Sequence, residues 1–213
     1  MDYILMLLPS MLKGLTVTLK LFSLTLLLAL PLGILMGMAR LSHFKPLKWF
    51  MEFYVWLFRG TPLLLQLLFM YFGLMTIGIR LEREIAAYLA FVLNYSAYLA
   101  EIFRSGIQSI SRGQYEAADV LGLNRFQTMR NIVLPQVFKR VLPPIGNEVI
   151  NLVKDTALIY VLAISELSRV ARTHVMRDGT FTPFIIAAVF YLIMTGTVQQ
   201  VFKWLESRFD YYR

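Results

Sequence analysis

The feature that most constrains the fold of this chain is a set of long apolar runs. The sequence has 213 residues, of which 58% are hydrophobic, whereas soluble domains contain about 45–50% apolar residues. The runs are long enough to cross a bilayer, which takes about 20 residues of helix. A helix satisfies its own backbone in lipid, and the runs lack the alternation of barrel strands. We therefore predict an all-α integral membrane protein.

Five transmembrane helices fit the chain, at residues 15–39, 50–74, 85–103, 145–165 and 184–202. No small-residue cleavage pattern follows the first run, so we interpret it as a retained span rather than a signal peptide. Nothing in the composition indicates a separate soluble domain. We expect residues 1–213 to form one transmembrane domain.

The basic residues predict the orientation, because cytoplasmic loops carry an excess of lysine and arginine. Four basic residues and one acidic residue surround the first connection: Arg40, Lys45, Lys48, Arg59 and Glu52. Six basic residues and two acidic residues lie between the third and fourth spans: Arg104, Arg112, Arg125, Arg130, Lys139, Arg140, Glu116 and Asp119. The other side is nearly neutral. This pattern places the N-terminus outside, and it accounts for the net charge of +8 without nucleic acid.

The long basic connection carries helix signals of its own. They are two capping-box pairs, a C-terminal glycine and a terminating proline: Ser111 with Gln114, Asn124 with Gln127, Gly122 and Pro135. They predict a helix–glycine–helix unit at about 111–135 on the cytoplasmic surface. From the residues alone, this unit either docks a soluble partner or rests on anionic lipid headgroups.

Polar side chains form two stripes inside the predicted spans, where an ionisable residue is by default a functional hypothesis. Each stripe has helical spacing and lies on one face: Asn94, Tyr98 and Glu101 in the third span, and Glu148, Asn151 and Asp155 in the fourth. If the two faces meet, they line a polar cavity. The asparagines have an alternative role in interhelical packing. Glu101 could alternatively form an ion pair with Arg59 or Arg104 that holds the spans together, instead of contacting a substrate. Lys154 adjoins Asp155 but points about 100° away from it.

Four sequence blocks resemble the permease subunits of ATP-binding-cassette (ABC) importers for polar amino acids. One is Glu116-Ala117-Ala118 with Gly122 and Leu134-Pro135, which is similar to the family's EAA loop. The others lie at 58–66, 98–107 and 152–158, so the resemblance covers almost the whole chain. The family often has serine at the position of Ala157 and glycine at that of Ser105. Neither difference threatens the assignment.

The resemblance implies a type I ABC importer permease-like fold whose EAA loop forms a coupling helix in a groove of a separate ATPase subunit. The implied coupling residues are Tyr115, Glu116, Ala117, Ala118, Leu121, Gly122 and Phe126. Tyr115, Leu121 and Phe126 either anchor in that partner or pack back on the permease. The Lys154–Asp155 pair would then serve gating or assembly rather than selectivity.

The resemblance also implies a transport subunit rather than an enzyme, in the inner membrane of a prokaryote. The chain has no G-x-x-x-x-G-K-[ST] loop, so ATP and Mg belong to the partner ATPase and this chain binds no cofactor. With no cysteine and only two distant histidines, no metal site is expected. The implied partners are two ATPase subunits, a second permease copy or sister permease, an extracytoplasmic amino-acid-binding protein and membrane lipid.

The charges of the polar stripes bear on the substrate. The expected cavity has a net negative charge, because it contains three acidic residues and one basic residue: Glu101, Glu148, Asp155 and Lys154. A negative cavity favours a basic amino acid such as arginine, lysine or histidine. Glutamine stays open. Two alternatives from other classes remain: a carrier or channel driven by an ion gradient, and a structural membrane partner that transports nothing.

Overall fold

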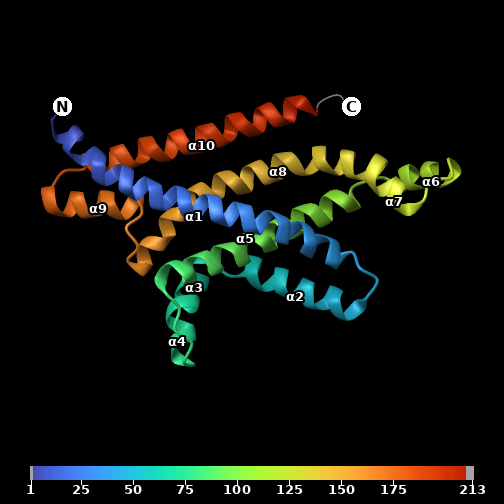
Figure 1. The fold of residues 1–213 in the computed structure, drawn as a ribbon, viewed down its shortest axis with the longest axis horizontal. Helices are drawn as coiled ribbons and strands as arrows, with labels where there is room; N and C mark the ends of the chain where they lie inside the picture. The colour runs from blue at the N-terminus through green and yellow to red at the C-terminus, as the bar shows by residue number, and fades with distance from the viewer. Residues whose placement is uncertain (1, 210–213) are drawn as a thin grey trace.

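The structure is a computed structural model that describes residues 2–209, and every regular element in that part of the chain is helical. The long helices α1 (Asp2–Arg40), α5 (Arg83–Gln108), α8 (Leu134–Asp155) and α10 (Thr182–Arg208) run lengthwise (Figure 1). The short helix α9 (Leu167–Asp178) lies near the N-terminus at one end, and α6 (Arg112–Val120) and α7 (Arg125–Thr128) lie at the other.

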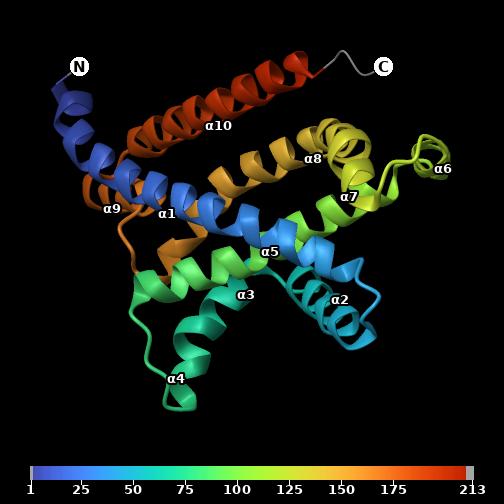
Figure 2. The same ribbon diagram turned by 45° about the vertical axis from the view of Figure 1, so that its right-hand side comes forward.

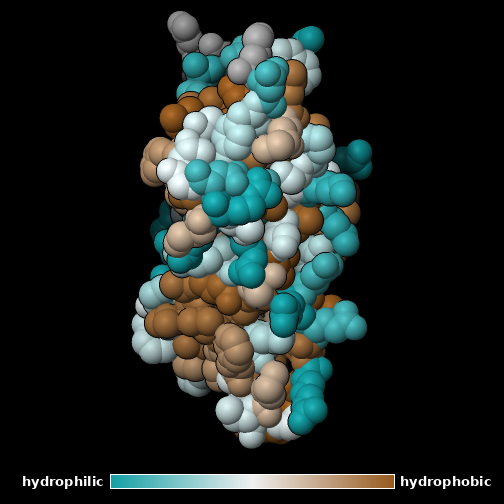
Figure 3. Space-filling view, turned by 90° about the vertical axis from the view of Figure 1, so that its left-hand side faces the viewer, coloured by the Kyte–Doolittle hydropathy of each residue, from teal (hydrophilic) through white to brown (hydrophobic). Residues whose placement is uncertain are grey.

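Three helices of the described residues, α1, α5 and α10, are long and apolar enough to cross a membrane. They contain the predicted spans 15–39, 85–103 and 184–202, although α1 begins much earlier, at Asp2. A fourth span is present if the bent pair formed by α2 (Lys45–Gly60) and residues Leu63–Thr76 counts as one. Seen from the end that holds α9, hydrophilic and hydrophobic residues share the surface, with a hydrophobic area in its lower part (Figure 3).

The predicted span at 50–74 is not a single straight helix, because the chain bends by 104° after Gly60. A proline has no N–H and disfavours a helical conformation in the residue before it. Thr61 is accordingly extended, with φ −120° and ψ 145°, and Pro62 precedes the new helix α3 (Leu63–Leu68). The π-helix η1 (Phe69–Gly73) and α4 (Leu74–Thr76) continue α3 away from the bundle (Figure 2).

The predicted span at 145–165 also differs from the structure. Its helix α8 begins at Leu134 and ends at Asp155, and the 3₁₀ helix η3 (Thr156–Leu162) follows it. The α8 segment is not among the apolar spans because it carries five charged residues: Lys139, Arg140, Glu148, Lys154 and Asp155. Pro135 does not end the preceding helix as predicted. It lies in the first turn of α8, where a missing N–H is tolerated, directly after the π-helix η2 (Met129–Val133).

The helix–glycine–helix unit has the predicted order. Gly122 has a left-handed φ of +72° after α6, which suits a glycine stop. Asn124 and Gln127 form the predicted capping box at the start of α7. Ser111 is the N-cap residue of α6, but its side chain makes no capping hydrogen bond, so the first predicted box is wrong. We call α6, the turn and α7 the elbow.

Small residues allow α1 to lie close along α5. A Cβ built on Gly33 would be 2.5 Å from the Cβ of Leu99, and one on Gly37 would be 2.9 Å from the carbonyl oxygen of Ala100. The main core fills the space between α1, α5, α8 and η3, and includes Leu21, Phe91 and Leu152. This contact fixes α5, which carries one of the two polar stripes.

Candidate functional site

The two predicted polar stripes meet at a cavity of about 400 Å³. Its walls come from α5, α8, η3 and the break in the second span: Asn94, Tyr95, Tyr98, Glu148, Asn151, Asp155, Leu158 and residues 61–64. We call it the acid-lined cavity, because among the described residues its wall holds two carboxyl side chains and no basic one. Five of the seven predicted cavity residues therefore lie together.

Two amide side chains stabilise the break that forms one wall. The Nε2 atom of Gln66 donates to the carbonyl oxygens of Phe58 at 2.9 Å and Thr61 at 3.1 Å. The Nδ2 atom of Asn94 donates to Phe58 O at 3.1 Å and to Gln66 Oε1 at 3.0 Å. These bonds supply donors to carbonyl groups that the end of a helix leaves without intrahelical partners. Asn94 thus has the packing role that was its alternative, as well as a place in the cavity wall.

Tyr95 is a wall residue that the sequence did not single out. Its hydroxyl donates to Asp155 Oδ2 at 2.8 Å, and its side chain is almost fully buried. The bond joins α5 to α8 and holds the Asp155 carboxylate at the cavity. A tyrosine between Asn94 and Tyr98 looks like an ordinary core aromatic, and only its distance of three residues from Tyr98 signalled a shared face.

The other two predicted residues lie elsewhere. Lys154 is exposed and does not line the acid-lined cavity. Glu101 lines a second cavity of about 410 Å³, which we call the arginine cleft, with Arg40, Glu52, Val55, Trp56, Arg59, Gly60 and Tyr98. Tyr98 is shared by both walls. The cleft lies further along α5 than Asn94, toward the elbow.

Glu101 is held by basic side chains from three helices. Arg104 Nη2 lies 2.5 Å from Glu101 Oε1, which confirms one predicted neutralising partner. Arg40 of α1 contacts the other carboxylate oxygen, and Arg59 of α2 lies further away at 3.9 Å. Arg40 was not among the predicted partners, because a contact across 61 residues leaves no local pattern in the sequence. Glu101 therefore ties α1, α2 and α5 together.

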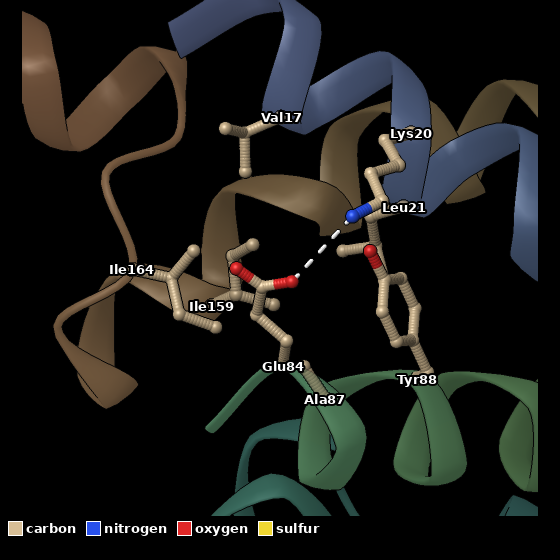
Figure 4. Close-up of a pocket in the computed structure, with 8 residues that line it drawn as sticks. All are labelled: Val17, Lys20, Leu21, Glu84, Ala87, Tyr88, Ile159 and Ile164. Carbon is tan, nitrogen blue, oxygen red and sulfur yellow. Dashed lines mark ion pairs between the residues drawn. The ribbon is translucent and has the colours of Figure 1, made fainter. Parts of the chain in front are cut away.

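A third cavity, of about 50 Å³, lies between α1, α5 and η3 (Figure 4). Lys20 and Glu84 form an ion pair of 3.6 Å at its edge, and both side chains are mostly exposed. Tyr88 lies beside the lysine, with the Lys20 Nζ atom 6.0 Å from the ring centroid. This space suits water rather than an amino acid. No described group of three His, Cys, Asp or Glu residues could hold a metal ion.

The elbow presents exposed apolar side chains. Leu121 and Phe126 are about 70% exposed, at 73% and 69%, and Val120, which the sequence analysis did not name, reaches 87%. Glu116, Ala117 and Gly122 are also exposed. We call these six residues the elbow surface. In contrast, Ala118 is fully buried and Tyr115 packs partly against the main core, so these two predicted coupling residues face this chain.

The end of the molecule near α9 is held by polar contacts. Glu166 is fully buried and caps α9, accepting from the backbone N–H groups of Ser168 at 2.7 Å and Arg169 at 2.6 Å. Asp178 accepts a hydrogen bond from the Tyr3 hydroxyl at 2.6 Å. The hydrogen bonds from Arg177 and Tyr3 hold the pKa of Asp178 below its ordinary value. The Tyr3–Asp178 bond joins α1 to α9.

The chain is similar to known transport proteins over nearly its whole length. Residues 29–211 match the family model described as binding-protein-dependent transport system inner membrane component. The arginine transport system permease protein ArtQ of Bacillus subtilis is 37% identical, with 94% of this chain and 92% of ArtQ covered. The glutamate/aspartate import permease protein GltK of Escherichia coli O6:H1 is also 37% identical, with 94% of each covered.

Solved structures agree with this similarity. A crystal structure of an amino acid ABC transporter with histidines shares 37% identity and a TM-score of 0.90, with 97% of each chain covered. An inward-facing structure of the MetNI methionine ABC transporter, at 18% identity, has a TM-score of 0.74 over 94% of this chain and 96% of that one, and supports the fold alone. The chain therefore belongs to the family of binding-protein-dependent inner-membrane transport components, as an amino-acid ABC transporter permease.

Proposed function

We propose that this permease imports cationic amino acids: arginine, lysine or histidine. The observation that carries the proposal is the charge of the acid-lined cavity. Glu148 and Asp155 are part of its wall, and none of its described wall residues is basic. Carboxylates in a poorly solvated site need a cation nearby. Since Lys154 lies outside the wall, a bound cationic side chain would meet two carboxyl groups and no lysine among the described wall residues.

The names of the relatives agree with an amino-acid substrate but do not choose among amino acids. ArtQ is named for arginine and GltK for glutamate and aspartate, at the same 37% identity. A putative glutamine permease of Rickettsia conorii is 35% identical. The choice of a cationic substrate therefore depends on the carboxyl groups in the cavity.

The proposal includes a topology and an assembly. The single domain 1–213 would have five spans, with the N-terminus outside and α8 with η3 as the fourth span. The charges of α8 suit a span that lines a polar cavity rather than lipid. The elbow surface would then contact one of the two ATPase subunits of the complex in the cytoplasm, and these subunits would bind ATP and Mg. A second copy or a sister permease would complete the pathway, and an extracytoplasmic binding protein would deliver the substrate.

Neutralising the cavity is expected to weaken arginine transport selectively. In proteoliposomes with ATPase and binding protein, Asp155→Asn and Glu148→Gln should each raise the KM for arginine by about tenfold, as expected when a charged hydrogen-bond acceptor becomes neutral. Uptake of glutamine should change much less. Glu84→Gln is the matched control, because Glu84 lies outside this cavity. Equal effects on arginine and glutamine would contradict the charge-matching proposal.

A bulky charge at the elbow is expected to prevent ATPase binding. Gly122→Arg places a long side chain on the elbow surface and should reduce ATPase co-purification by at least about tenfold, the scale of losing one strong interface contact. Gly113→Arg is the control, since a Cβ added at Gly113, like one added at Gly122, meets nothing within 4 Å. Gly122→Ala separates added bulk from the strain of the positive φ. If Gly122→Arg recruits the ATPase normally, the elbow is not the coupling surface.

A further inference from the structure

Arg59 lies where the acid-lined cavity and the arginine cleft adjoin. Its guanidinium carbon is 5.3 Å from the ring centroid of Tyr98. That ring is the one side chain from α5 that lines both the acid-lined cavity and the arginine cleft. Arg59 itself lines only the cleft. A cation on this face of Tyr98 stands at the boundary between a space whose charged wall residues are carboxyl groups and a space lined by two arginines and two glutamates.

Among the arginines around Glu101, Arg59 is the one that is least restrained. Arg40 and Arg104 contact the Glu101 carboxylate directly, whereas Arg59 is 3.9 Å away. The Arg59 side chain is 41% exposed, compared with 12% for Arg40 and 25% for Arg104. If Arg59 moved, Glu101 would keep its two closer partners. Movement of Arg59 therefore leaves the Glu101 carboxylate paired with Arg40 and Arg104.

The position of Arg59 is also linked to the bend in the second span. It is the penultimate residue of α2, and Gly60 and the extended Thr61 follow it directly. A Cβ at Gly60 would meet no atom within 4 Å, so the backbone there has room. A change in the angle between α2 and α3 would carry the Arg59 guanidinium toward or away from Tyr98.

We propose that Arg59 is a gating residue that closes the passage between the acid-lined cavity and the arginine cleft to cationic amino acids. With its guanidinium over Tyr98, a substrate cation that leaves the carboxyl groups meets a like charge and an occupied aromatic face. When the bend moves Arg59 away, the ring and the cleft become accessible to the substrate. This inference rests on the proposed import of cationic amino acids.

The test is leakage of preloaded amino acid from proteoliposomes that contain the whole transporter and no ATP. Arg59→Ala should increase the leak of labelled arginine by about fivefold, within the range expected for loss of a cation–π contact and a like charge. The leak of labelled glutamine should rise less than twofold, because a neutral side chain is not repelled by Arg59. A permease that was merely loosened would leak both amino acids equally.

The control is Lys48→Ala, which removes a comparably exposed cation from the same helix and does not line the arginine cleft. Arg59→Lys gives a second variant if the alanine variant does not assemble. It keeps the charge but not the planar stacking group, so its leak should fall between wild type and Arg59→Ala. An arginine leak in both Arg59 variants equal to that of wild type and Lys48→Ala would overturn the gate. Failure of the wild-type transporter to take up arginine would instead overturn the proposed substrate, and the gate with it.

Discussion

Replacing Glu101 by alanine is expected to lower the free energy of unfolding by about 2–3 kcal/mol. Removal of one partner of a buried ion pair costs about 3–5 kcal/mol, and the value is reduced here because Glu101 is 22% exposed. The loss arises because Arg40 and Arg104, whose side chains are 12% and 25% exposed, would lose their carboxylate partner. Three helices would lose their common contact.

The measurement is unfolding of the purified permease in detergent, followed by circular dichroism. Glu84→Ala is the matched control, since it removes a glutamate from the same helix whose pair with Lys20 is mostly exposed. Such pairs contribute about 0–1 kcal/mol. A double-mutant cycle of Arg40→Ala with Glu101→Ala then isolates the longer-range pair. Equal losses for Glu84→Ala and Glu101→Ala would show that the Glu101 cluster is no stronger than a surface pair.

The sequence predicted those helices that local patterns define. A long, mostly apolar run was enough to locate α5, α10 and the second part of α1, and Gly122 with the Asn124–Gln127 pair was enough for the elbow. The break at Pro62 was missed because hydropathy continues across it. The bent conformation depends on Gln66 and Asn94, whose side-chain amides donate hydrogen bonds to carbonyl groups at the bend. Asn94 lies on another helix, α5, so the sequence around Pro62 does not reveal its contribution.

At α8 the error was the reverse, because a proline predicted to end a helix does not end one. Pro135 was expected to end a helix, but the π-helix before it changes the hydrogen-bond pattern and the chain continues as α8. Pro143 and Pro144 also lie inside that helix. Packing against α5 and α10 outweighs local helix propensity here, as tertiary contacts commonly do.

For the candidate site, helical spacing identified which residues share a face but not what faces them. The stripes predicted five residues of the acid-lined cavity, and the structure brings those five together. The sequence did not show that Glu101 lies outside the acid-lined cavity, because that position depends on its contact with Arg40, 61 residues away. Tyr95 was missed for a similar reason, since its role appears only when Asp155 is placed opposite its hydroxyl.

Adding one methyl group at Gly33 is expected to cost about 2 kcal/mol of stability, within the range for overpacking a close contact. The new Cβ would lie 2.5 Å from the Cβ of Leu99 and 3.3 Å from the backbone nitrogen of Ala100. These atoms belong to or adjoin the backbone, so no side-chain rotation removes the clash. Helices α1 and α5 must therefore move apart.

Gly196→Ala in α10 is the matched control, because a Cβ there meets nothing within 4 Å. It should leave stability unchanged or raise it by up to about 1 kcal/mol through helix propensity. The separation of α1 from α5 should also weaken the Arg40–Glu101 contact, which lies one to two turns beyond Gly33. Gly33→Ala combined with Glu101→Ala should then cost less than the sum of the two single losses. Strict additivity would mean that the close approach of α1 and α5 is not what positions Arg40 against Glu101.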